Sequence, residues 1–287
     1  MNTLHITAAI LGVSIIISFL YGLITRNYST VDRLWSILPG IYCLVWMTDY
    51  YDNVRFIIAA CLIIVWGARL TFNFARRGGY AFSWKQGFSG EDYRWAVLRN
   101  KIQNRILFEI FNLVFISFFQ LALVFWITVP LYYVGQIQKP LNTIDILLFA
   151  LHAVLLVGET IADNQQCAYH RKKNLPEYAA NSRYQLGFNT FGLWRFSRHP
   201  NYACEIGQWI IVACYAINAS GTLHKSGIGA IVLIVLFVGS TALAESITAS
   251  KYSRYREWCG FTACWIPLVS LIVNGTKRRA FFDSLKA

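Results

Sequence analysis

The chain has 287 residues, of which 56% are hydrophobic and 14% charged, and its mean hydropathy is +0.44. This balance excludes an ordinary soluble globular protein. The formal net charge of +12 is spread over several loops rather than gathered into one patch, so we expect no nucleic-acid partner.

Seven apolar stretches approach the length that crosses a bilayer as a helix, which is about 20 residues. In chain order they are residues 4–24, 34–49, 54–74, 106–134, 142–163, 201–219 and 227–249. The second and sixth stretches are the weakest. The pattern predicts an all-α polytopic membrane protein with about seven transmembrane helices. The first stretch lacks the basic start and cleavage site of a secretory signal, so we expect it to be retained.

The connections between these stretches are short, and no repeat or linker divides the chain. We therefore expect a single membrane domain, residues 1–287, with its longest loops at residues 75–105 and 164–200. If the N-terminus is outside the cytoplasm, 22 of the 26 Lys and Arg residues lie on the inner side. The positive-inside rule then predicts an outer N-terminus and a cytoplasmic C-terminus. Arg55, Lys139 and Lys225 would lie on the outer side.

Polar side chains gather at the predicted inner ends of five of these stretches. Glu159, Asp163 and Gln166 are spaced i, i+4 and i+7, which places them on one face of a helix. The same spacing recurs after Pro200, a residue that suits the first turn of a helix. It places a second set on one face: Asn201, Glu205 and Gln208. With Asp32, Arg33, Arg69 and Glu245 at the same depth, the pattern predicts a polar site open to the cytoplasm.

The two long loops interleave arginines with aromatic residues. Guanidinium groups bind phosphate oxygens in pairs, and aromatic faces stack on flat rings. These loops therefore favour a phosphorylated nucleotide cofactor, although contact with anionic lipids would use the same residues. The sequence contains no G-x-G-x-x-G, Walker A or HExxH motif, and its seven cysteines show no CxxC spacing, so we expect no soluble-type nucleotide fold and no metal site.

A set of ordered motifs between about Thr30 and Leu268 resembles a known membrane family. The motifs are VDRLWS (31–36), WGARL (66–70), GEDYRW (90–95), ETIADNQQ (159–166), GLWRFSRHPNYACE (192–205), and a tail with Glu245, Tyr255 and IPL (266–268). In this order they resemble the steroid 5-alpha-reductase-like membrane proteins, in particular the bacterial branch catalogued as a domain of unknown function. RHPNY alone is less specific, because isoprenylcysteine carboxyl methyltransferases carry a similar element.

The resemblance implies NADPH-dependent reduction of the carbon–carbon double bond of a hydrophobic enone, such as a 3-oxo-delta-4 steroid. It implies catalytic roles for Asp32, Trp66 and Glu205; Trp66 stands where the animal enzymes have a tyrosine. By the same resemblance and the positions described above, the cofactor would be bound by Arg77, Arg94, Glu159, Asp163, Arg171, Arg195, Arg198, His199, Asn201, Tyr202, Trp209, Glu245 and Tyr255.

Reduction of an enone also needs a group that stabilises the developing enolate oxygen. Burial would keep Asp32 neutral and able to donate a hydrogen bond, whereas an ion pair with Arg69 would leave it a purely structural role. Two other functions remain open: an S-adenosylmethionine-dependent membrane methyltransferase, and a non-enzymatic lipid-binding or transport protein. The partners we expect are the lipid bilayer and a steroid-like small molecule, for a monomer in a bacterial inner membrane or, in a eukaryote, the endoplasmic reticulum.

Overall fold

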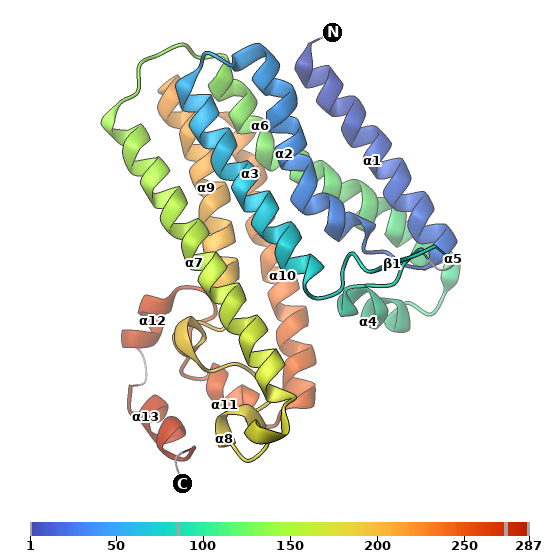
Figure 1. Ribbon diagram of the computed structural model, residues 1–287, viewed down its shortest axis with the longest axis vertical. Helices are drawn as coiled ribbons and strands as arrows, with labels where there is room; N and C mark the ends of the chain where they lie inside the picture. Colours follow the sequence, from blue (N-terminus) through green and yellow to red (C-terminus); the bar gives the residue numbers. More distant parts are fainter. Residues whose placement is uncertain (1, 85–86, 273–274, 286–287) are drawn as a thin grey trace. The chain divides into compact units, whose positions relative to one another are not determined.

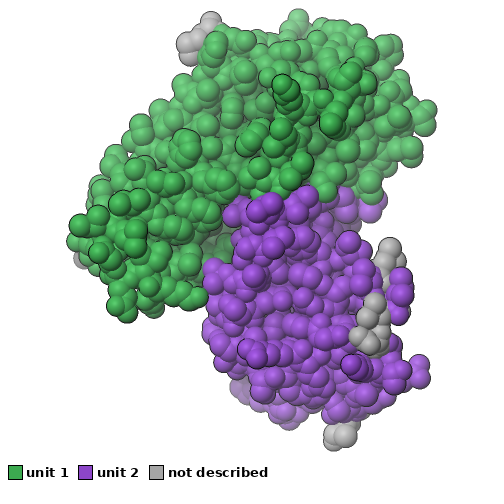
Figure 2. Space-filling view, turned by 180° about the vertical axis from the view of Figure 1, so that it is seen from behind, with its two compact units in different colours: residues 1–152, 209–233 green, residues 153–208, 234–287 purple. Residues whose placement is uncertain are grey.

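The computed structural model describes residues 2–84, 87–272 and 275–285. The chain divides into two compact units (Figure 2). Unit 1 comprises residues 1–152 and 209–233, and unit 2 comprises residues 153–208 and 234–287. Three of the predicted spans, those at 142–163, 201–219 and 227–249, contribute residues to both units.

Unit 1 is built from long helices that pack side by side (Figure 1). They are α1 (Thr3–Thr25), α2 (Thr30–Tyr50), α3 (Val54–Ala75) and α6 (Gln120–Gly135). A short helix α5 (Arg105–Phe111) and a π-helical segment (Asn112–Phe119) run without a break into α6. Unit 1 also holds the start of α7 (Thr143–Lys173) and the end of α9 (Pro200–Ser220).

Helix α1 has the residue distribution of a membrane helix rather than of a soluble one. Its buried positions are small: Thr3, Thr7, Ser14, Ser18 and Gly22. Its exposed positions are large and apolar, among them Val13, Ile16, Ile17, Leu20 and Ile24. Lipid solvates large apolar side chains, while small residues let helix backbones approach closely. The hydroxyl of Ser117 donates to that of Ser18 over 3.2 Å, which joins the π-helical segment to this face.

Helices α2 and α3 approach each other at Gly67. A Cβ atom at this position would lie 2.4 Å from the carbonyl oxygen of Ser36, so no larger residue fits without movement of the backbone. The hydroxyls of Ser36 and Thr71 also form a hydrogen bond of 2.8 Å between the two helices. The helix ends are satisfied locally. Asn53, for example, accepts a hydrogen bond from the amide of Phe56 at the start of α3.

The loop between α3 and α5 is ordered by a residue of α2. It forms a hairpin of β1 (Phe82–Ser83) and β2 (Gly87–Phe88), followed by α4 (Tyr93–Lys101); residues 85 and 86 lie outside the described part. The buried Arg33 donates to the carbonyl oxygens of Gly79, at 2.8 Å, and Gly90, at 2.6 Å. Its guanidinium lies 4.2 Å from the centroid of the Phe88 ring. One buried cation therefore fixes both sides of the loop.

Unit 2 contains the polar halves of α7 and α9, the helix α10 (Ile228–Lys251) from Ile234 onward, and a set of short elements. The short helices are α8 (Ser182–Gln185), α11 (Tyr255–Cys259), α12 (Pro267–Ile272) and α13 (Gly275–Asp283). Single 3-10 turns lie at Pro176–Tyr178 and Gly192–Arg195, and a further one at Lys225–Gly227 precedes α10 in unit 1. An aromatic core holds these elements together: Leu186, Phe188, Tyr255, Trp258, Phe261, Phe281 and Phe282.

Five helices in the described residues are long and apolar enough to cross a membrane. They lie at Thr3–Thr25, Val54–Ala75, Arg105–Gly135, Thr143–Lys173 and Lys225–Lys251. The protein is therefore a nearly all-helical, multi-pass membrane protein. The two stretches that the sequence marks as weakest form helices of 21 residues each, α2 and α9, but are not among these five.

One helix is longer than the predicted span and enters the segment predicted as a loop. Helix α7 continues to Lys173, well beyond residue 163 and into the segment predicted as a loop. The reason is local: no glycine or proline interrupts the sequence before Pro176, so the helix persists after its apolar part has ended.

Candidate functional site

The polar faces of α7 and α9 contact each other in unit 2. Gln208 donates from Nε2 to Oε2 of Glu159 over 2.7 Å, and Asn201 donates from Nδ2 to Oδ1 of Asp163 over 3.3 Å. The helices can approach here because Gly207 faces Leu155: a Cβ on this glycine would lie 2.7 Å from Cδ1 of the leucine. The two polar sets that the sequence places on separate helices are thus side by side.

The two amides are oriented by the carboxylates that they meet. Each amide presents its NH2 group to an oxygen of the carboxyl group, which accepts the hydrogen bond. This leaves Oδ1 of Asn201 and Oε1 of Gln208 buried, and neither has a donor among the described residues. A buried acceptor without a donor costs about 1–3 kcal/mol. These two oxygens on the same face of α9 are acceptors that a bound hydrogen-bond donor could use.

Glu205 lies on α9 between these amides, and its side chain is only 8% exposed. It has a further interaction, as do Glu159 and Asp163. Buried acids of this kind are unusual unless they are paired or bind a ligand. Three carboxyl groups and two amides therefore share a short stretch of the α7 and α9 surfaces.

A second cluster surrounds Glu245 on α10. Its Oε1 accepts from Nε of Arg198 at 2.6 Å and lies 3.1 Å from Nε2 of His199. The segment that carries the arginine and the histidine is fixed by backbone hydrogen bonds of 2.9 Å to the carbonyls of Ala263 and Cys264. Arg198 and His199, which the sequence assigns to the cofactor, therefore already have partners within the protein.

The same cluster brings possible metal ligands together. Ligand atoms of His199, Glu245 and Cys264 lie within 4.8 Å of one another. The guanidinium of Arg198 contacts the same carboxylate oxygen and supplies the positive charge that a cation would bring. The positive charge of Arg198 therefore already balances the carboxylate of Glu245.

The other predicted residues of unit 2 have different environments. Tyr202 stacks on His199, with ring centroids 5.1 Å apart. Tyr255 is a member of the buried aromatic core and packs edge-on against Phe188 at 5.0 Å. Arg171 and Arg195 are exposed, the first in the last turn of α7 and the second at the end of a 3-10 turn.

In unit 1, Asp32 is held by the loop that Arg33 organises. Its Oδ2 accepts from the indole N–H of Trp95 at 2.8 Å, and its nearest ion-pair partner is Arg94, at 3.9 Å. The ion pair with Arg69 that the sequence left open is not among the contacts of Asp32 in the described residues. Arg94 itself binds Asp92 through Nε at 2.8 Å. Although burial opposes ionisation, this guanidinium keeps the pKa of Asp92 below its usual value.

Trp66 of α3 and Trp209 of α9 form an edge-to-face pair in unit 1, with ring centroids 5.0 Å apart. Their exposed fractions are 1% and 2%, and neither indole N–H has an acceptor in the part of the chain that the structure describes. Buried tryptophan N–H groups usually find an acceptor. These two donors therefore mark a second place where a polar ligand atom is expected. Arg77, also assigned to the cofactor, is exposed at the end of α3.

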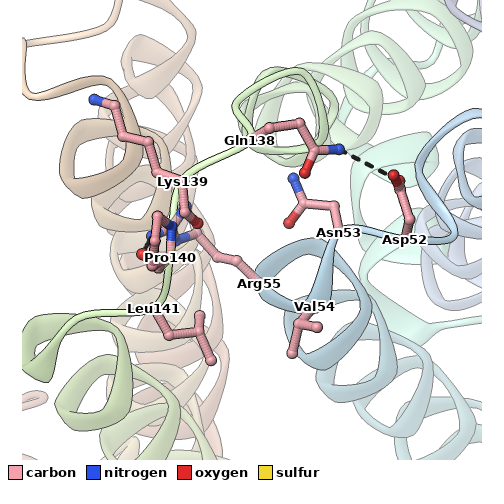
Figure 3. A pocket seen from close by; sticks show the side chains of 8 residues that line it. All are labelled: Asp52, Asn53, Val54, Arg55, Gln138, Lys139, Pro140 and Leu141. Carbon is pink, nitrogen blue, oxygen red and sulfur yellow. Dashed lines mark hydrogen bonds between the residues drawn. The ribbon is translucent and has the colours of Figure 1, made fainter.

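A hollow of about 500 Å³ lies at the opposite end of unit 1, between the α2–α3 turn and the α6–α7 connection (Figure 3). Its polar groups bind one another. Gln138 donates to Asp52 at 3.3 Å, and the guanidinium of Arg55 binds the carboxylate of Asp145 through two contacts of 2.8 Å. The sequence analysis predicted only that Arg55 lies on the outer side of the membrane, and it did not predict the ion pair with Asp145. We interpret this hollow as a structural junction rather than a ligand site.

Comparison with known sequences identifies the family. The profile of a family described as "Protein of unknown function (DUF1295)" matches residues 18–262. The chain belongs to the DUF1295 family. It is also 32% identical over 273 residues to an uncharacterized protein of the fission yeast Schizosaccharomyces pombe, an alignment that covers 86% of this chain and 76% of the relative. No solved structure matches the chain.

The matched range contains every residue that we assigned to the site from the sequence. The ordered polar motifs are thus features of a DUF1295 protein.

Proposed function

We propose that this DUF1295 protein is an NADPH-dependent reductase of a hydrophobic enone, most simply a 3-oxo-delta-4 steroid. The observation that carries the proposal is the pair of buried amide oxygens on α9, each held in place by a carboxylate of α7. A nicotinamide carries a carboxamide whose NH2 group donates hydrogen bonds, so it matches acceptors of this kind. The resemblance of the motif order to steroid 5-alpha-reductases supports the same assignment.

The residues of unit 2 fit such a cofactor. Asn201 and Gln208 would accept from its carboxamide, with Glu159 and Asp163 keeping both amides in the required orientation. When bound, NADPH supplies the hydride. Arg195 has its guanidinium 4.6 Å from the Phe282 ring, and no ion pair of it is found among the described residues, so it is available to a phosphate group.

The residues of unit 1 would act on the enone. The indole N–H of Trp66 or Trp209 can donate a hydrogen bond to a carbonyl oxygen and stabilise the charge that develops on it. An indole does not give up its proton at neutral pH, so the proton for the alpha carbon must come from another group. Asp32 fits this role in its neutral form; its hydrogen bond from Trp95 holds the carboxyl group in one orientation.

We further propose seven membrane spans, with α2 and α9 added to the five apolar helices, an outer N-terminus and a cytoplasmic C-terminus. The distribution of Lys and Arg along the chain supports this orientation. It places the carboxyl-terminal half of α7 at the cytoplasmic side, where NADPH is available. The host membrane would be the bacterial inner membrane or the endoplasmic reticulum.

The test measures ligand binding and turnover by the purified protein in detergent. We expect saturable NADPH binding, and oxidation of NADPH that depends on an added 3-oxo-delta-4 steroid. Gln208→Met should weaken NADPH binding roughly threefold to tenfold, the effect of losing one hydrogen bond. The matched control Gln138→Met, which changes the same residue type at an exposed loop position, should bind normally.

Saturable binding of S-adenosylmethionine without binding of NADPH would favour the methyltransferase alternative, because the same acids can hold a cationic methyl donor. Absence of binding for both, in protein that retains its thermal transition, would leave the non-enzymatic alternative.

A further inference from the structure

Unit 2 has a basic cavity that the transfer of the hydride itself does not require. Its volume is about 620 Å³, and it is lined by α8, the 3-10 turn Gly192–Arg195 and the C-terminal helix α13. Four arginines line it: Arg183, Arg195, Arg278 and Arg279. The family match ends at residue 262, so the part of the cavity formed by α13 lies beyond the region that this chain shares with the family profile.

Three of the four guanidinium groups are held in position by aromatic faces. Arg183 lies 3.7 Å from the centroid of the Phe191 ring, and Arg195 lies 4.6 Å from that of Phe282. Arg278 lies 4.5 Å from the centroid of Phe196, and its NH1 donates to the carbonyl of Ser270 at 3.0 Å. Stacking of this kind holds the plane of a guanidinium while leaving N–H groups at its edge for an anion. In Arg183, Nε and NH2 donate to Thr190, so its NH1 group remains for this role.

The positive charge in the cavity is not neutralised by ion pairs. In the described ranges none of the four arginines forms an ion pair with a carboxylate. Burial, and then the charge of Arg195, lower the pKa of Arg183 and of Arg278, as expected where guanidinium groups are crowded together. The lining contains one acid, Asp283, which has another contact. Such an arrangement costs free energy unless an anion binds.

We propose that this cavity binds a phosphate monoester, with Arg183, Arg195, Arg278 and Arg279 as its ligands. Guanidinium forks pair with phosphate oxygens bidentately, and a monoester carries close to two negative charges near neutral pH. Two sources carry this group: a soluble nucleotide with a terminal phosphate, such as the 2′-phosphate of NADPH, or the headgroup of phosphatidic acid. Only the first source rests on the proposed function.

The experiment uses the full-length protein in phosphatidylcholine nanodiscs. One arm titrates adenosine 2′,5′-bisphosphate by calorimetry. The other arm replaces part of the lipid with phosphatidic acid and measures its retention on the detergent-extracted protein by native mass spectrometry. The variant is Arg278→Gln with Arg279→Gln. The matched control, Lys251→Gln with Arg256→Gln, removes the same charge from exposed positions elsewhere in unit 2.

We expect Arg278→Gln with Arg279→Gln to weaken binding of the nucleotide or of phosphatidic acid tenfold or more, since each lost charge-assisted hydrogen bond contributes about a factor of ten. The control should match the wild type. A difference in the nucleotide arm assigns the cavity to a soluble phosphate, and a difference in the lipid arm assigns it to the membrane. No difference between variant and wild type in either arm overturns the proposal.

The experiments can reject the phosphate-site proposal and the reductase proposal independently of each other. If steroid-dependent oxidation of NADPH is absent but either arm shows the expected loss of binding, the phosphate site is supported and the reductase proposal is rejected. If oxidation is present and neither arm shows a loss of binding, the reductase proposal is supported and the phosphate site is rejected. A charge-conserving variant, Arg278→Lys with Arg279→Lys, retains the charge but not the bidentate geometry, so it should give an intermediate affinity and serves if the glutamine variant does not fold.

Discussion

The buried ion pair between Arg55 and Asp145 gives a prediction whose size follows from the structure. The side chains are 1% and 0% exposed, and both carboxylate oxygens lie 2.8 Å from the guanidinium. Asp145 also accepts from the amide N–H of Asn142 at 2.9 Å and from Nδ2 of Asn218 at 2.6 Å. The carboxylate therefore joins the starts of α3 and α7 to the end of α9.

Asp145→Asn removes the charge and leaves the guanidinium of Arg55 buried without a counter-ion. Loss of one partner of a buried pair costs about 3–5 kcal/mol. At roughly 2–4 °C per kcal/mol for a unit of this size, the midpoint of thermal unfolding should fall by roughly 6–20 °C. The measurement is scanning fluorimetry of the detergent-purified protein, which follows the many tryptophans of the chain.

The matched control is Asp52→Asn at the rim of the same hollow, where the carboxylate is exposed and accepts one hydrogen bond of 3.3 Å from Gln138. This change should cost less than about 0.5 kcal/mol. The double variant Arg55→Met with Asp145→Leu should lose much less than the sum of the single changes, because no charge is then left unpaired. Equal midpoints for Asp145→Asn and Asp52→Asn would refute the argument that the pair is buried and holds these helices together.

Two further predictions concern packing and charge. Gly67→Ala should destabilise unit 1 by about 2 kcal/mol or more, because its Cβ would lie 2.4 Å from a carbonyl oxygen of α2. The control Gly40→Ala should not destabilise it, because the Cβ would lie 3.8 Å from its nearest neighbour. Equal midpoints of thermal unfolding for the two variants would contradict the close α2–α3 contact at Gly67. Glu245→Gln should lower the stability of unit 2 by about 1–2 kcal/mol, because Arg198 loses the charge that it binds at 2.6 Å. The control Glu257→Gln changes an exposed ion pair and should lower the stability by less than about 0.5 kcal/mol. An equal loss of stability in the two variants would show that the ion pair of Glu245 stabilises unit 2 no more than an exposed pair does.

The membrane helices could be predicted closely because the bilayer imposes a simple rule on the sequence. Each of the five apolar helices begins within a residue or two of the predicted start, since the change from polar to apolar residues marks the point of entry. The C-terminal end of helix α7 could not be predicted from hydropathy. The helix continues after the apolar stretch has ended, and hydropathy does not report the helix propensity of polar residues.

The polar sets on α7 and α9 could also be predicted, because i, i+4 spacing fixes which side chains share a helical face. Their hydrogen bonds could not. Whether Gln208 pairs with Glu159 depends on how closely two helices far apart in the chain approach, and that depends on Gly207 and Leu155. The environment of Asp32 was hidden as well, because its partner Trp95 lies in a loop whose position is set by Arg33.

Sequence alone determined that this protein is a multi-pass helical membrane protein and which of its polar residues share a helical face, since both follow from local patterns of residue type. Tertiary structure alone decided which of those residues bind each other and which keep an unpaired buried atom. It pairs Arg198 and His199 with Glu245, and Arg55 with Asp145. It also brings four arginines together around one cavity. Pairings of this kind depend on distances between helices and loops that no local pattern encodes, because they arise only when the whole chain has packed.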